Sequence, residues 1–92
     1  MKITFDPAKR DEALSERGLD FQAAAQVFEG LVLTLEDGRR DYGEIRFQTY
    51  GSLDGRIVMI VWTPRGEARH VISMRYCHEK EARRVRDRMG RS

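Results

Sequence analysis

Residues 57–77, IVMIVWTPRGEARHVISMRYC, decide the fold because they combine three different local signals. Residues 57–62 are apolar without alternation, which is typical of a strand that is buried on both faces. Residues 63–67 contain a proline and a glycine and predict a hairpin turn. Residues 69–77 contain no glycine or proline, and apolar and polar residues alternate in their second half, which predicts a second strand. The stretch therefore predicts a β-hairpin whose first strand is central in a sheet.

The second strand of this hairpin is expected to have one polar and one apolar face, because side chains alternate across a strand. The two sets are Arg69, Val71, Ser73, Arg75 and Cys77 on one side, and His70, Ile72, Met74 and Tyr76 on the other. We expect the second, more apolar set to pack inward, which favours a structural role for His70 over the alternative of a role in a site. Arg69 and Arg75 would then share the outer face, about 20 Å apart along the strand.

Turn and cap residues divide the rest of the chain into further elements. Asp6-Pro7 predicts the start of a helix that ends at Gly18, and Asp20 predicts the start of another that ends at Gly30. The remaining expected elements are strands at 2–5, 31–35 and 44–50, with an Asp54-Gly55 hairpin turn, and a last helix at 78–89. The order is β-α-α-β-β-β-β-α, an α+β fold with a mostly antiparallel sheet of four to five strands.

Length and composition predict one small intracellular domain that spans residues 1–92. The longest apolar run is residues 57–62, too short to cross a bilayer, and the first six residues reach charge and proline, unlike a signal peptide. The single cysteine, Cys77, cannot form an internal disulfide, which favours the reducing cytoplasm. We expect no membrane contact.

Charge is distributed unevenly along the chain. Residues 1–46 hold 7 Lys and Arg against 10 Asp and Glu, a net −3, whereas residues 47–92 hold 10 against 5, a net +5. Such asymmetry indicates an anionic partner for the second half, although a solvated basic helix gives the same pattern. Fourteen of the 17 basic residues are arginines, whose planar guanidinium suits phosphate.

An arginine-bearing sheet face suits a single-stranded nucleic acid. If residues 44–50 lie beyond the central strand, Glu44 and Arg46 join the face of Arg69 and Arg75, and Tyr50 or Trp62 can stack on bases. The alternatives are that Trp62 belongs to the core and that the arginines form ordinary surface ion pairs. The expected ion-pair partners are Glu44, Glu67 and Glu79.

Other site chemistries find little support in the sequence. Two histidines and one cysteine, with Cys77 and His78 adjacent, lack the spacing of a zinc site. The glycines fall in turns and form no phosphate-binding loop. We therefore expect no metal and no cofactor.

Two long stretches carry recognisable motifs: residues 5–30, FDPAKRDEALSERGLDFQAAAQVFEG, and residues 41–75, which contain DYGEIR and TPRGEARHVISMR. They resemble the opening and the D-Y-G-E-x-R and T-x-R-G-x-x-R-x-I-S-A-R blocks of the BrnT toxins of bacterial type II toxin–antitoxin systems. The resemblance extends from Ile3 to about Arg84. It implies a fold like that of RelE-type ribonucleases and one toxin-like ribonuclease domain.

The resemblance also implies an activity and partners. BrnT toxins cleave RNA without a metal and thereby block translation. Their partner is BrnA, a ribbon–helix–helix antitoxin, and operator DNA is bound only through that antitoxin. The alternatives are a non-catalytic nucleic-acid-binding module and an inactive toxin homologue that only binds its antitoxin.

Basic residues of the family match Lys9, Arg46, Arg69 and Arg75. The chain departs from the family pattern at Phe5, Ala13 and Arg17, and at Tyr76, where many members carry a second basic residue.

Metal-free RNA cleavage needs a base for the 2′-hydroxyl, cations for the phosphorane and an acid for the leaving oxygen. The expected catalytic residues are Arg75, Arg69, Arg46, Glu44 and His78. The expected RNA-binding residues are Lys9, Arg65, Tyr76 and Arg83.

Overall fold

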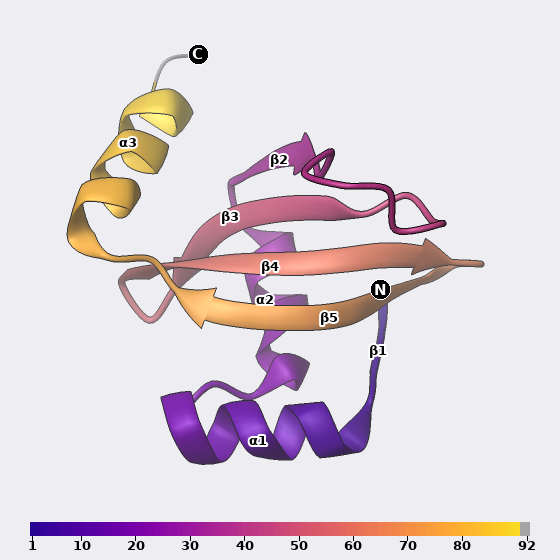
Figure 1. Cartoon of the computed structure of the whole chain (residues 1–92). Coiled ribbons are helices and arrows are strands. Elements are labelled where there is room, and N and C mark those ends of the chain that lie inside the picture. The colour runs from indigo at the N-terminus through magenta and orange to yellow at the C-terminus, as the bar shows by residue number, and fades with distance from the viewer. Residues whose placement is uncertain (91–92) are drawn as a thin grey trace.

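The computed structural model describes residues 1–90. These residues form a five-stranded sheet with helices on both faces (Figure 1). The strands are β1 Lys2–Phe5, β2 Val32–Glu36, β3 Phe47–Leu53, β4 Arg56–Arg65 and β5 Ala68–Tyr76. The helices are α1 Pro7–Arg17, a 3-10 turn at Phe21–Ala23, α2 Ala24–Glu29 and α3 Glu79–Gly90. None of these helices is long and apolar enough to cross a membrane.

The sheet is mixed, which corrects the expectation of a mostly antiparallel one. Its order is β1-β5-β4-β3-β2, and β2 to β5 form an antiparallel meander, but β1 pairs with β5 in parallel. Short turns predict antiparallel neighbours along the chain. No local signal predicts how β1 pairs with a strand that lies more than 60 residues further on.

Local cap and turn signals are confirmed where α1 and the β3–β4 hairpin begin and end. The Asp6 side chain accepts a hydrogen bond from the Ala8 N–H, and Gly18 ends α1 with a left-handed φ of 68°. Asp54 and Gly55 have φ values of 51° and 82°, as a tight hairpin with two left-handed residues requires. On α1, however, Ala13 is buried and Leu14 is exposed, which is the reverse of what size alone suggests.

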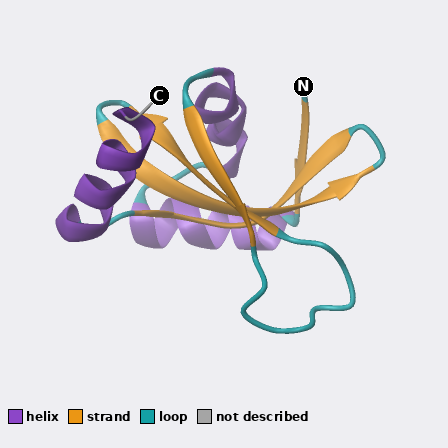
Figure 2. Cartoon of the chain, turned by 90° about the horizontal axis from the view of Figure 1, so that it is seen from above, coloured by secondary structure: helices purple, strands orange, loops and turns teal. Residues whose placement is uncertain are grey.

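Helices α1 and α2 cover one face of the sheet, and α3 lies at one end of the opposite face (Figures 1 and 2). We call these the α2 face and the α3 face. The core of the α2 face includes Phe21, Val27, Ile60 and Met74, and that of the α3 face includes Met59, Val61 and Val85. Residues 37–46, expected to be strand from 44 onward, form a loop that projects on the side opposite α2 (Figure 2).

Candidate nucleic-acid interface and active site

A β-bulge at Ile72 reverses the expected faces of part of β5. Val61 pairs with Ser73, but the next residue, Trp62, pairs with Val71, so Ile72 has no partner on β4. One extra residue shifts the alternation by one position. The residues before the bulge therefore lie on the faces opposite to those predicted, whereas the residues after it keep their predicted faces.

The bulge brings His70, Ser73 and Arg75 to the α3 face. His70 pairs with Thr63 across β4, Ser73 with Val61 and Arg75 with Met59. Met74 and Tyr76 point to the α2 face, as predicted, but His70 does not. The expectation that His70 packs among the apolar residues is therefore wrong.

Arg69 lies on the α2 face and not beside Arg75, which is the main correction to the predicted platform. Its guanidinium carbon is 4.4 Å from the ring centroid of Phe28 and 4.9 Å from that of Trp62. Trp62 is buried, and its Nε1 donates a hydrogen bond of 2.8 Å to Thr49 Oγ1. The interpretation of Trp62 as a core residue is confirmed, and Arg69 covers that core.

Arg75 forms a two-point ion pair with Glu81 of α3. The Nη1–Oε1 and Nη2–Oε2 distances are 2.8 Å and 3.0 Å, and 39% of the Arg75 side chain remains exposed. The contact raises the pKa of Arg75 and lowers the pKa of Glu81 to about 2. The expectation of an ion pair is thus confirmed with a different partner, because α3 folds back over the end of β5.

His70 is the other titratable group of β5 on this face. It is half-buried, and its Nδ1 lies 2.9 Å from Oγ1 of Thr4 on β1. Burial lowers the pKa of His70 below its ordinary value of 6.5. Arg65 and Lys9 also lower that pKa, whereas Glu44 and Asp6 raise it, so charges of both signs act on the ring.

The loop of residues 37–46 lies against β4 at the end of the α3 face that carries His70. Thr63 Oγ1 donates a hydrogen bond of 2.7 Å to the Ile45 carbonyl oxygen, which holds the loop against β4. Arg46 Nε lies 3.0 Å from Glu44 Oε2, and the Arg46 guanidinium stacks 4.1 Å from the ring centroid of Tyr42. The loop therefore carries the predicted Glu44 and Arg46 as an ion pair.

Asp37 anchors the loop where it leaves β2. Its buried carboxylate accepts hydrogen bonds from Arg39 Nε and Nη2 at 2.8 Å and 2.7 Å. These bonds lower the pKa of Asp37 to about 2. Asp37 is thus charged at neutral pH and keeps the loop in place.

The remaining predicted residues are dispersed. His78 is exposed, and its Nδ1 accepts a hydrogen bond of 3.4 Å from the Glu81 N–H at the start of α3. Arg83, also exposed on α3, has its Nη2 3.5 Å from Glu79 Oε1.

Tyr76 points to the α2 face, where the Arg56 guanidinium stacks 3.7 Å from its ring centroid, so it does not join Arg75. Lys9 and Arg65 are exposed and have no ion-pair partner among residues 1–90.

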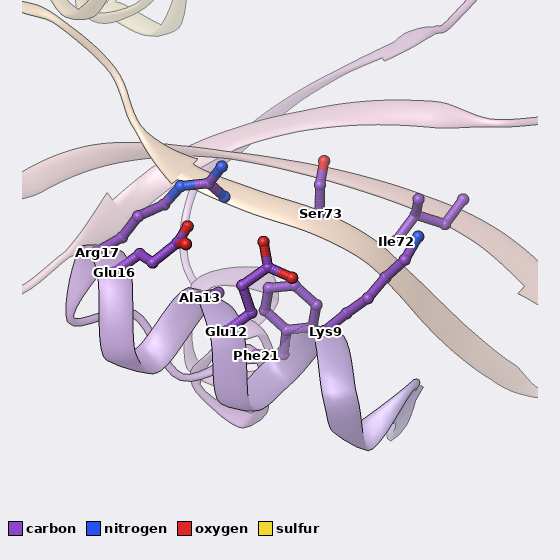
Figure 3. A pocket seen from close by; sticks show the side chains of 8 residues that line it. All are labelled: Lys9, Glu12, Ala13, Glu16, Arg17, Phe21, Ile72 and Ser73. Atoms are coloured by element: carbon purple, nitrogen blue, oxygen red, sulfur yellow. The ribbon is translucent and has the colours of Figure 1, made fainter.

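A groove of about 200 Å³ lies between α1 and β5, and the sequence did not predict it (Figure 3). β1 pairs with β5 only up to Val71, so the edge of β5 beyond that point faces α1. Arg17 Nη1 donates a hydrogen bond of 3.2 Å to the Met74 carbonyl oxygen on this edge. The other side chains that line the groove are Lys9, Glu12, Ala13, Glu16, Phe21, Ile72 and Ser73. The difference in length between β1 and β5 was the available signal.

The described residues bring cationic side chains, but no cluster of metal-ligating ones, to the candidate site. Within residues 1–90, no three His, Cys, Asp or Glu side chains gather closely enough to hold a metal ion. Burial raises the pKa of the Cys77 thiol to about 12, so it stays protonated and is no nucleophile at neutral pH.

One family model matches the chain. It is described as the ribonuclease toxin BrnT of type II toxin–antitoxin systems, and the match covers residues 5–81. The matched range includes α1, strands β2 to β5 and the Arg75–Glu81 pair. No curated protein matches the chain.

Proposed function

The chain belongs to the BrnT family of ribonuclease toxins of type II toxin–antitoxin systems, and on that premise we propose that it is a metal-independent endoribonuclease that binds single-stranded RNA across its α3 face. The observation that carries the proposal is the bulge at Ile72. It gives His70, Ser73 and Arg75 one common face, in place of the Arg69–Arg75 face expected from alternation.

The charges around this face support RNA as the ligand. Lys9 and Arg65 are exposed near His70, and Arg46 lies on the neighbouring loop. Their ammonium and guanidinium groups suit successive phosphates of an extended strand. Tyr50 is half-buried on the same face, where β3 pairs it with Met59.

Arg75 is the residue we assign to the phosphorane. A guanidinium stays protonated and donates two parallel hydrogen bonds, which suits the extra negative charge of the transition state. Glu81 now accepts both bonds, so the RNA phosphate must displace or share this carboxylate. We keep Glu44 and Arg46 as contributors from the loop, and His78 and Arg83 as contributors from α3. We withdraw Arg69 and Tyr76, because both point to the α2 face.

The family membership implies an antitoxin partner. We propose that this partner is of the BrnA type, that operator DNA is bound only through it, and that RNA cleavage blocks translation in the cytoplasm. We also propose that the fold is like that of RelE-type ribonucleases. The order of elements, with α1 and α2 before the meander and α3 after it, supports this proposal.

The Arg75–Glu81 pair also favours a second candidate, an inactive homologue that only binds its antitoxin. A closed ion pair stabilises α3 on the sheet whether or not RNA is bound. In that case Arg75 is structural, and the family fold is retained for the antitoxin alone.

Cleavage of a short 5′-labelled RNA by the purified chain in EDTA tests the proposal. We expect cleavage by the unmodified chain and at least a hundredfold loss for Arg75→Ala, with the circular dichroism spectrum retained. Arg56→Ala, which removes an arginine from the α2 face, is the matched control. Intact RNA with the folded, unmodified chain would favour the inactive homologue.

A further inference from the structure

We propose that His70, held by Thr4, is the general base that takes the proton of the RNA 2′-hydroxyl. The inference rests on the proposed ribonuclease activity and names a residue of that same site. It starts from the contact between Nδ1 of His70 and Oγ1 of Thr4, at 2.9 Å.

The contact with Thr4 occupies Nδ1 of the ring and leaves Nε2 free. Thr4 Oγ1 can accept from or donate to Nδ1, and the proposed role requires the tautomer in which Nδ1–H donates, so that Nε2 carries the lone pair. β1 and β5 pair in parallel with Thr4 opposite His70, so two adjacent strands of the sheet fix the ring. Nε2 is the atom left for substrate.

Three titratable groups near Arg75, which are Glu81, Cys77 and Tyr50, do not change protonation near neutral pH. The pKa of Glu81 is about 2 and that of Cys77 is about 12, and burial raises the pKa of Tyr50 above its ordinary value. Imidazole is the side chain best suited to take a proton near neutral pH. Of the two histidines, His70 lies on the sheet face, whereas His78 is exposed and its Nδ1 already accepts a hydrogen bond from the Glu81 N–H at the start of α3.

The charges around His70 suit a phosphodiester. Arg65 approaches from the end of β4, Lys9 from α1 and Glu44 from the loop, while Asp6 lies just before α1. Figure 3 shows Lys9 extending from α1 towards Ile72, the bulge residue two positions after His70. Two cations beside the ring attract the phosphate that follows the attacking ribose.

Nε2 accepts the 2′-hydroxyl proton, and the 2′-oxygen forms a bond to the adjacent phosphorus. The bond from phosphorus to the 5′-oxygen breaks, and that oxygen takes a proton from water. The products are a 2′,3′-cyclic phosphate and a 5′-hydroxyl, and His70 then releases its proton to solvent.

The test compares the unmodified chain with His70→Ala and His70→Asn in EDTA. The Asn side chain can still donate to Thr4 but cannot act as a base, so it also covers the case in which the alanine variant fails to fold. We expect kcat/KM to fall about 10²- to 10⁴-fold in both variants. The Kd for a non-cleavable RNA with 2′-deoxy sugars should change less than threefold.

Two further readouts separate catalysis from structure. In the unmodified chain kcat/KM should rise with pH up to an apparent pKa below 6.5, as His70 loses its proton, and this acidic limb should be absent in both variants. Added imidazole should restore part of the activity of His70→Ala. Gln26→Ala, an exposed residue on α2, is the control and should match the unmodified chain.

The outcomes distinguish the two proposals. Cleavage by His70→Asn at the normal rate with the acidic limb intact would overturn the role of His70 and leave the ribonuclease proposal standing. Absence of cleavage by the folded, unmodified chain would overturn both.

Discussion

Two arginines of the same strand, six positions apart, have different surroundings. Arg75 faces Glu81 and the proposed RNA surface, whereas Arg69 lies over Phe28 and Trp62. Arg69 has no ion-pair partner among the described residues. Its guanidinium covers aromatic rings, which indicates a contribution to stability and not to catalysis.

We expect Arg69→Ala to lower the free energy of unfolding by about 1–2 kcal/mol, because it removes a cation from two aromatic faces and uncovers part of them. Urea denaturation followed by tryptophan fluorescence measures this loss. Arg56→Ala, which removes an exposed arginine from a single ring, should cost less. Weaker RNA binding by Arg69→Ala with unchanged stability would return Arg69 to the RNA surface.

The sequence predicts that these arginines lie on a strand, but it does not predict which face of the sheet each side chain occupies. Strict alternation from Arg69 to Cys77 assigns every face, and no glycine or proline marks the bulge at Ile72. The bulge depends on how β5 meets β4 and β1, which is a tertiary property. The caps at Asp6 and Gly18 were predictable because each involves only neighbouring residues.

At the scale of elements, the close contact between α2 and β3 depends on Gly51. A Cβ at this position would lie 2.6 Å from Val27 Cγ1 and 3.2 Å from Val32 Cγ1. Val27 is buried and its branched side chain has little freedom to move. Absence of a side chain at Gly51 thus lets α2 approach the sheet.

We expect Gly51→Ala to destabilise the chain by about 1–3 kcal/mol through overpacking. Val27→Ala creates a cavity and also destabilises it, but the double variant should lose less than the sum, since each change relieves the other. Thermal and urea unfolding of all four chains measure the coupling. Gly38→Ala, where an added Cβ meets nothing within 4 Å, is the control. Additive losses would mean that α2 and β3 do not compete for this space.

The order and kinds of elements followed from turns, caps and periodicity, but their pairing across the sheet did not. The parallel partner of β1 and the loop at residues 44–46 depend on contacts between distant segments. The contacts of the candidate site could not be predicted for the same reason. His70 and Thr4 meet across 66 positions of sequence, so their contact has no local signal.

At the scale of the whole molecule, basic residues lie at both ends of the long strand β4. Arg56 begins this strand and Arg65 ends it, and ten residues at about 3.3 Å each place them roughly 30 Å apart. That distance exceeds the Debye length of about 8 Å at physiological salt. The two ends of the sheet therefore act as separate electrostatic surfaces.

We expect Lys9→Gln with Arg65→Gln to reduce the salt dependence of RNA binding. A single strand releases about 0.7 counterion for each phosphate contacted, so loss of two contacts should flatten the slope of log K against log salt by about 1.4. Fluorescence anisotropy of a labelled, non-cleavable RNA at several salt concentrations measures this slope. The control is Arg56→Gln with Arg86→Gln, which removes the same charge at the other end of β4, where Arg86 Nη2 bonds the Gly55 carbonyl. Since both pairs lower the net charge equally, a general effect of charge would flatten both slopes alike. A larger decrease of the slope in the control pair would instead move the RNA towards the β3–β4 hairpin and Arg86, away from His70.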